Sequence, residues 1–325
     1  MMKRIVLAAG ALLCLRTLPT QAADLKDLPS ETKWVLSLDM KAAQAAPMLT
    51  YLIDKIAPAK RQEAQTKLAA IKALFGVDLL NDIDQLVIAG NGNAEMGGVA
   101  YVYGTFDVQR LSTILAGSKD FTTAPHGGFT VLGWNDDKQK YLSFAKPGLA
   151  MLSNSRTSLT DALDVLDGNK KGLAPDSTFK SALSRPSQGL LTVQAVDVPS
   201  IVGEQPKAQA LKQAQALRLC VNASQPDALS AELSVTTASD DTALQIQQAL
   251  MGIQALAMLR AGEAPEQATL ASLAKISNQG RTVGVTLTLS KSVVETYVRQ
   301  REARQAAKDT AAAAPVQAIT PAAKN

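Results

Sequence analysis

One local pattern recurs along this chain and constrains its fold: a short stretch of alternating apolar residues ends at Asp or Ser, and helical spacing begins there. The alternating stretches are residues 34–38, 99–105, 149–152, 233–237 and 283–289. The polar residues that follow them are Asp39, Asp107, Ser155, Asp240, and Ser290 or Ser292. Such side chains accept hydrogen bonds from the free N–H groups of a first helical turn. The pattern therefore predicts strands that are followed directly by helices.

The order of the expected elements recurs as well. The first half is expected to contain, in order, a strand at 34–38, helices at 41–56 and 60–75, strands at 85–90 and 98–105 and a helix at 107–116. Three further strands and a helix at 156–167 follow. The second half has strands at 190–197, 217–223, 229–237 and 281–289 and helices at 199–214, 240–261 and 291–307. With the extra elements removed, each half reads β-α-β-β-α-β, the order of the ferredoxin-like, split βαβ unit. We predict an α+β fold of two tandem units, with antiparallel-rich sheets and helices on one face.

The ends of the chain differ from its middle. Lys3 and Arg4 precede an apolar run from Ile5 to Leu15, and small residues follow at 20–23, as in a secretory signal peptide. The run is too short to span a bilayer, which needs about 20 residues. We therefore expect a signal peptide at 1–23, a first α+β unit at 24–185, a second at 186–305 and a disordered Ala/Pro tail at 306–325. The mature protein is expected to be extracytoplasmic, periplasmic or secreted, with no transmembrane segment.

Net charge and cysteine content argue against nucleic-acid binding and against a reactive thiol. Without Lys3, Arg4 and Arg16, the 33 basic residues fall to 30, against 29 acidic ones. So small a net charge does not favour nucleic-acid binding. Cys14 lies in the signal region, where a lipoprotein cysteine is the alternative reading, and Cys220 is the only other cysteine. Cys220 lies in an alternating stretch, which favours a buried, inert thiol.

The polar candidates for catalysis lack the partners that catalysis needs. His126 is the single histidine, lies in a turn composition, and is expected to be an exposed turn residue. Asp161 and Asp164 share a helix face, and Asp136 and Asp137 lie in a turn, so either pair is a candidate for carboxylate chemistry. Solvated turns and an ordinary polar helix face are the favoured explanation of both pairs. The glycines around 90–98 lack the Lys-Ser/Thr of a phosphate loop and predict a hairpin. We assign no catalytic residue, no metal ligand and no cofactor.

The segment 240–261 is the most suggestive for binding. Ile246 and Leu250 follow helical spacing, and Met251 and Met258 widen the apolar face. Such a helix either packs in a core or forms the wall of a hydrophobic groove or interface, for which methionine is well suited. We take Ile246, Leu250, Met251 and Met258 as the candidate surface for a ligand or partner.

Three short patterns carry a resemblance. They are Gly-x-Phe-Asp at 104–107 with Arg110 and Leu111, Gly-Trp-x-Asp at 133–136, and Ala-Leu-Asp-Val-Leu-Asp-Gly at 162–168. In these the chain resembles a family of exported bacterial proteins, over about residues 80–185. The resemblance implies export and a shared fold, and it carries no activity.

Together these features predict an exported, non-enzymatic binding or structural protein of the cell envelope or periplasm. Its partner is an envelope protein or a lipid-like ligand, held without a cofactor. A carboxylate-dependent hydrolase and a carrier of a lipid-like ligand are the alternatives. An oligomeric envelope component, with the tail as a tether, is a further possibility.

Overall fold

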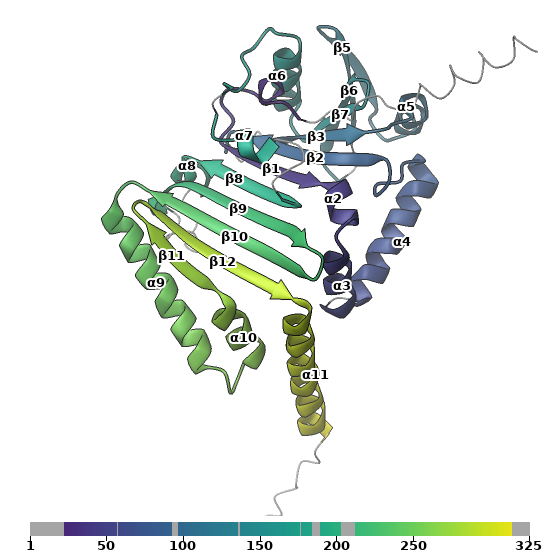
Figure 1. Cartoon of the computed structure of the whole chain (residues 1–325). Helices are drawn as coiled ribbons and strands as arrows, with labels where there is room; N and C mark the ends of the chain where they lie inside the picture. Colours follow the sequence, from purple (N-terminus) through teal and green to yellow (C-terminus); the bar gives the residue numbers. More distant parts are fainter. Residues whose placement is uncertain are drawn as a thin grey trace, which may run out of the picture.

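The computed structural model of the chain describes residues 23–56, 58–92, 97–135, 137–175, 177–183, 189–202 and 212–313. The strands are β1 (Trp34–Asp39), β2 (Ile83–Gly90), β3 (Gly98–Gly104), β4 (Thr122–His126), β5 (Phe129–Asn135), β6 (Gln139–Lys146), β7 (Leu149–Ser153), β8 (Leu191–Val196), β9 (Ala214–Gln225), β10 (Ala228–Thr237), β11 (Lys275–Gln279) and β12 (Thr282–Ser290). They form one sheet of 12 strands, in the order β11-β12-β10-β9-β8-β1-β2-β3-β7-β6-β5-β4 (Figure 1). Every neighbouring pair is antiparallel. The α+β class and the antiparallel sheet are confirmed.

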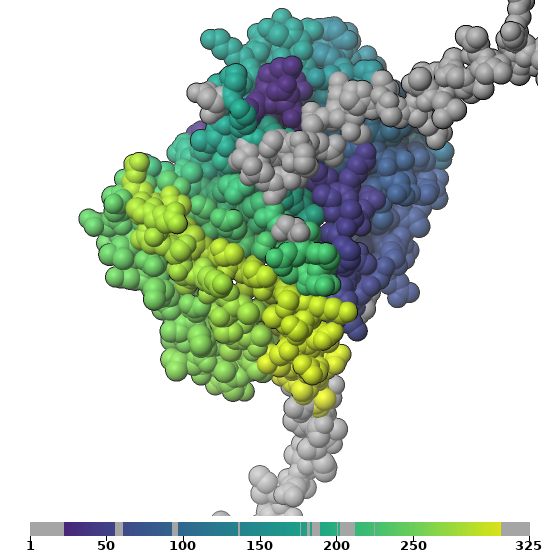
Figure 2. All heavy atoms as spheres, in the orientation of Figure 1, coloured from purple at the N-terminus to yellow at the C-terminus, as the bar shows by residue number. Residues whose placement is uncertain are grey.

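The two halves of the chain share this sheet through their first strands. β1 pairs with β8, with Leu36 opposite Val193. Outward from that pair, each half lays down two neighbouring strands, crosses by a helix to the outer edge and returns toward the centre. In Figure 2 the first half (purple to teal) and the second half (green to yellow) lie on opposite sides of the molecule. The two halves therefore share one arrangement: three consecutive strands lie next to one another from the centre outward, and the strand after the crossing lies at the outer edge.

The strand order differs from that of the predicted ferredoxin-like units. A split βαβ unit places a third strand between the two strands that its first helix connects. Here β1 and β2 are direct neighbours and antiparallel, although helices connect them. The Trp34 ring of β1 packs closely on both following strands, because a Cβ built at Gly90 of β2 or Gly98 of β3 would lie 2.9 Å or 3.1 Å from it. A single strand, β12, lies between β10 and β11, which α9 and α10 connect, whereas three strands lie between β3 and β4, which α5 connects.

The helices are η1 (Leu25–Asp27, a 3₁₀ turn), α2 (Met40–Gln44), α3 (Pro47–Ile56), α4 (Pro58–Phe75), α5 (Val108–Ala116), α6 (Arg156–Leu166), α7 (Lys180–Leu183), α8 (Val198–Val202), α9 (Asp240–Leu259), α10 (Pro265–Leu273) and α11 (Lys291–Ala313). They cover both faces of the sheet, so the prediction of helices on one face was wrong. Leu163 of α6 packs with Met151, whereas Leu115 of α5 packs with Ala150. Met151 and Ala150 are consecutive in β7 and therefore point to opposite faces. Because both faces of β7 are apolar, each needs its own covering layer.

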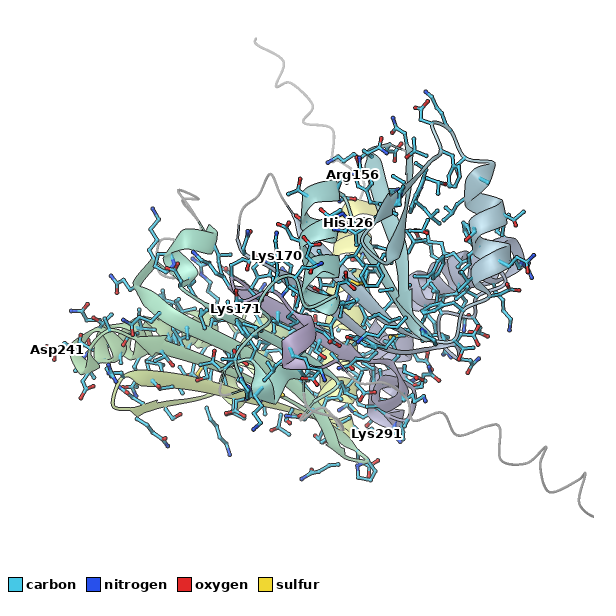
Figure 3. All side chains as sticks on the ribbon, turned by 90° about the horizontal axis from the view of Figure 1, so that it is seen from above. His126, Arg156, Lys170, Lys171, Asp241 and Lys291 are labelled. Atoms are coloured by element: carbon cyan, nitrogen blue, oxygen red, sulfur yellow. The ribbon has the colours of Figure 1, made fainter. Side chains whose placement is uncertain are left out.

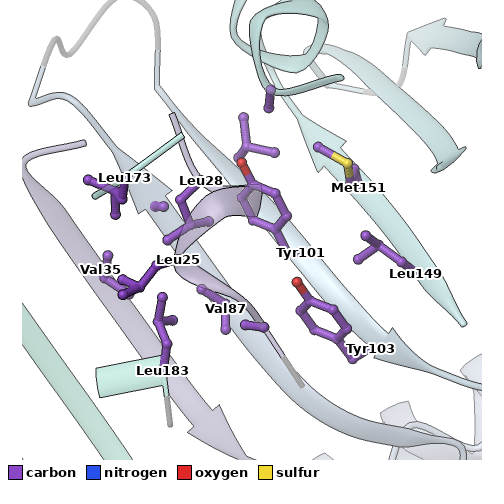
Figure 4. Close-up of a cluster of buried hydrophobic side chains, with 14 of the residues drawn as sticks. Leu25, Leu28, Val35, Val87, Tyr101, Tyr103, Leu149, Met151, Leu173 and Leu183 are labelled. Carbon is purple, nitrogen blue, oxygen red and sulfur yellow. The ribbon is translucent and has the colours of Figure 1, made fainter. Parts of the chain in front are cut away.

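The largest core lies under η1 and α6 in the first half (Figure 4). Leu28, Tyr101, Leu159 and Leu163 are fully buried there. The N-terminal segment is tied to the sheet by Gln85, whose Oε1 accepts from the Ala23 amide at 3.3 Å. Gln85 also donates to Ser37 Oγ at 3.0 Å. The segment after residue 22 is thus part of the first half's core.

The predicted helix starts are confirmed in three places. The side chains of Asp39, Asp107 and Ser155 accept from the amides three residues later at 2.9, 2.9 and 3.2 Å. At α9 the cap is Ser239 and not Asp240, because Ser239 Oγ accepts from the Thr242 amide at 3.2 Å. Before α11, Ser290 Oγ faces the Val293 amide at 3.5 Å.

Other boundaries were predicted wrongly. A helix was expected at 199–214. In the structure α8 ends at Val202 and β9 begins at Ala214, and residues 203–211 lie outside the described residues. Residues 306–313 of the expected disordered tail belong to helix α11, and 314–325 lie outside the description. The signal peptide lies outside it too, except for Ala23. β4, α10 and β11 were not expected. The boundary at 185 between two units stays a prediction.

Candidate functional site

An apolar pocket lies between the sheet and the helices α4 and α5, and we call it the α4–α5 pocket. Its volume is about 270 Å³. It is lined by Ile71, Phe75, Val77, Leu79, Ile83, Val102, Phe106, Leu111, Leu115, Trp134, Leu142, Phe144, Ala150 and Leu152. Every lining residue is apolar, and the pocket opens to the surface. Such a site can bind an apolar group by the hydrophobic effect.

The sheet supplies the floor of the pocket through strand alternation. Strand pairing brings together Val102, Ala150, Phe144 and Leu142, because Val102 lies opposite Ala150 and Ala150 lies opposite Phe144. Alternate residues share one face, so these strands present an apolar row to α5. Aromatic side chains gather here although the chain has only 6 Phe and 2 Trp. The Phe106 and Phe144 ring centroids are 6.3 Å apart.

The end of α4 supplies the rim, and Arg110 of α5 positions it. Arg110 donates to the Ala73 carbonyl at 3.4 Å. A Cβ at Gly76, whose φ is +69°, would lie only 2.5 Å from the guanidinium, so glycine makes room for this contact. A cation at a helix C-terminus is also favourable electrostatically. Only the end of α4 reaches the pocket, through Ile71 and Phe75, while Leu74 is 65% exposed.

An ion pair fixes the turn that follows α4. Lys72 Nζ donates to Asp78 Oδ2 at 2.8 Å, and the Asn81 amide group donates to the same carboxylate oxygen at 2.9 Å. The hydrogen bond from Lys72, followed by that from Asn81, holds the pKa of Asp78 well below its usual range. These hydrogen bonds to Asp78 hold the turn from which Val77 and Leu79 line the pocket.

The four residues of the predicted binding surface do not lie in this pocket, and the structure divides them. Ile246 packs against the buried cluster of Val198, Ala214 and Val235 in the second half's core. Leu250 is half-buried, whereas Met251 and Met258 are exposed by 52% and 49%. The α4–α5 pocket itself was missed by sequence reasoning. A concentration of scarce aromatics at 75, 106, 134 and 144 was the available signal.

His126 lies in strand β4 and not in an exposed turn, which corrects the prediction. Its Nε2 is 2.7 Å from Asp164 Oδ1 of α6, and both side chains are half-buried. Figure 3 shows His126 beside this helix, which begins at the labelled Arg156. Lys170 Nζ donates to Asp161 Oδ1 at 2.6 Å and lies 3.9 Å from Asp164. The hydrogen bond to Asp161 raises the pKa of Lys170. The carboxylates of Asp161 and Asp164 thus each have a side-chain partner. His126 connects the β4–β5 hairpin to α6, and Lys170 connects the loop after α6 to the same helix.

The structure also locates most of the other residues that the sequence analysis singled out. Cys220 is buried, as predicted, with Sγ 3.8 Å from Thr192 Oγ1. The glycines around 90–98 connect β2 and β3 as a hairpin. Asp136 lies outside the described residues, and Asp137 is exposed. Among the residues that the structure describes, no three His, Cys, Asp or Glu side chains lie close enough to hold a metal ion.

No described helix has the length and apolar character needed to cross a membrane. No protein-family model matches the chain, and no curated protein matches it. Among solved structures, the chain is similar to TP0453 in two crystal forms. Form III matches with a TM-score of 0.51 and 12% identity over 86% of this chain and 98% of that chain. Form IV matches with a TM-score of 0.50 and 12% identity over 85% and 96%. At this identity the chain shares with TP0453 a fold, and the likeness says nothing about activity.

Proposed function

We propose that this chain is an exported, non-enzymatic binding protein that holds an apolar, acyl-chain-like ligand in the α4–α5 pocket. The observation that carries the proposal is the all-apolar lining around a volume of about 270 Å³. Export rests on the signal-peptide features of residues 1–23. A periplasmic or secreted location belongs to the same proposal.

The size and chemistry of the pocket define the ligand class. Apolar cavities of about 150 Å³ stay dry and bind benzene-sized molecules. This pocket is larger and lies just below the usual range for small-molecule sites, about 300–1,000 Å³. Each methylene removed from water contributes about 0.8 kcal/mol. An alkyl or acyl chain fits this lining, and a polar headgroup would stay at the open side.

Tryptophan emission gives a direct test, because Trp134 lines the pocket and Trp34 is the only other tryptophan. The Trp34→Phe variant of the full chain leaves Trp134 as the sole reporter. We expect titration with a fluorescent fatty-acid analogue to quench Trp134 by energy transfer, with saturation at one analogue per chain. Unlabelled fatty acid is expected to displace the analogue.

A pocket-filling variant supplies the control for location. Ala150 is buried at the pocket floor, so Ala150→Leu is expected to weaken binding of the analogue at least tenfold. Ala231→Leu, at a half-buried alanine of β10 in the other half of the sheet, should leave binding unchanged. Equal binding by both variants, or no saturable quenching of Trp134, would refute the proposal.

A role as an envelope component that binds a protein partner stays a prediction. A protein partner on the α9 surface is a separate question from the pocket. The hydrolase alternative, which rests on Asp161 with Asp164 or on Asp136 with Asp137, has gained no specific observation in its favour.

A further inference from the structure

Helix α9 carries an apolar surface on the outside of the molecule. Six of the ten large apolar residues that are exposed in the described part of the chain lie on this helix. Leu259 is 81% exposed, Ile253 64% and Leu256 60%. Figure 1 shows α9 along the side of the sheet away from α4. So concentrated an exposed apolar surface indicates an interaction site.

The charge pattern of α9 restricts what can cover this surface. Residues 242–259 contain no charged side chain, whereas Asp241 stands at one end of the helix and Arg260 follows the other. Helices that lie on anionic membranes are typically rich in Lys and Arg on their polar face. A strongly acidic or basic partner would find no counter-charges along these residues. The occupant that fits is apolar in its middle and carries opposite charges at its two ends.

Gly252 adds a second constraint. It lies in the middle of the helix, where glycine is less favourable than alanine. A Cβ built at Gly252 meets nothing within 4 Å, so packing inside this chain does not require the glycine. Ala249, one turn before it, is exposed too. The small side chains allow another helix to approach closely at this point.

We propose that the outer face of α9, formed by Asp241, Ala249, Gly252, Leu256, Leu259 and Arg260, docks on the same face of a second copy of this chain. These residues recur at helical spacing and are all exposed. In an antiparallel pair centred between Leu250 and Met251, Ala249 lies opposite Gly252 of the second copy. The same symmetry places Asp241 opposite Arg260 of the second copy, twice. A twofold axis therefore makes the surface complementary to itself in shape and in charge.

The size of this surface predicts a weak dimer. A helix of 20 residues is about 30 Å long and about 10 Å wide, so its contact covers roughly 300 Å² per partner. Stable interfaces bury about 800 Å² per partner. We therefore expect a weak, reversible association and not a permanent dimer.

Sedimentation velocity of the full chain, from about 1 μM to about 200 μM, measures this association. We expect a monomer–dimer equilibrium that Gly252→Glu weakens at least tenfold, because it places like charges near the twofold axis. The fold should tolerate that change, since the position is open. Ala64→Glu, at an exposed position of α4, is the matched control and should leave the equilibrium unchanged.

Charge reversal distinguishes a second copy from any other partner. Asp241→Arg and Arg260→Asp should each weaken the dimer, and the double variant should restore it, because the pair of charges is exchanged in both copies. A chain that stays monomeric at every concentration would overturn the proposal. So would single variants without effect, or a double variant without rescue. Binding of the wild type, but not of Gly252→Glu, to vesicles of zwitterionic lipid without dimerisation would assign this surface to a membrane instead.

Discussion

Replacing Ala150 by leucine tests whether the α4–α5 pocket is a true cavity, because the sign of the stability change depends on it. Ala150 is only 4% exposed and lies on the pocket floor. Leucine adds three carbons, and each buried methylene contributes about 0.8 kcal/mol. Ordering the leucine side chain costs about 0.5–1 kcal/mol. If the three carbons enter an existing volume of about 270 Å³, the free energy of unfolding should rise by about 1.5 kcal/mol.

The opposite result has an equally definite cause. In a site that is already filled, extra methylenes force side chains out of their rotamers and cost about 1–3 kcal/mol. Urea unfolding, followed by tryptophan emission and by far-UV circular dichroism, measures the difference from the midpoint at an unchanged slope. A loss of stability in Ala150→Leu would refute the pocket and the function built on it. Together with the binding experiment, the expected result is unusual: a variant that is more stable and binds less.

Two further predictions concern polar groups. Tyr101 is fully buried, its hydroxyl has no hydrogen-bond partner among the described residues, and burial raises its pKa far above the ordinary value. Tyr101→Phe should therefore raise the free energy of unfolding by about 1 kcal/mol in urea titrations, and a loss of that size would mean that the hydroxyl is hydrogen-bonded. The hydrogen bond from Lys72 lowers the pKa of Asp78, so its contribution to stability is present above the ordinary Asp pKa and is lost as pH falls through the folded-state value. The difference in urea midpoint between wild type and Asp78→Asn should be constant from about pH 7 to 5 and shrink below about pH 4; a difference that grows there would contradict the pairing.

Much of the local structure was predictable. Alternation located ten of the strands, and the caps Asp39, Asp107 and Ser155 were identified because a cap acts within three residues of sequence. β4 and β11 were missed. Both are short edge strands, Thr122–His126 and Lys275–Gln279, and neither buries an apolar face that alternation could reveal.

The candidate site was much less predictable. The four residues of the predicted binding surface are all apolar and lie on one helix. Ile246 and Leu250 are half-buried, whereas Met251 and Met258 are exposed. Helical spacing gives the angle between residues, and it does not give the direction in which the sheet lies. His126 was misplaced for a similar reason, since its partner Asp164 is 38 residues away.

The sequence by itself determined ten of the strands, three of the helix starts and the signal-peptide pattern, because these follow from periodicity and from contacts a few residues apart. The tertiary structure alone decided that β1 pairs with β8, that both halves share one sheet, and that residues from α4, α5 and five strands enclose an apolar pocket. These outcomes depend on which apolar faces meet across long separations in sequence. Many pairings satisfy the same alternation, and only the packing of the whole chain, such as Trp34 over Gly90 and Gly98, selects one of them.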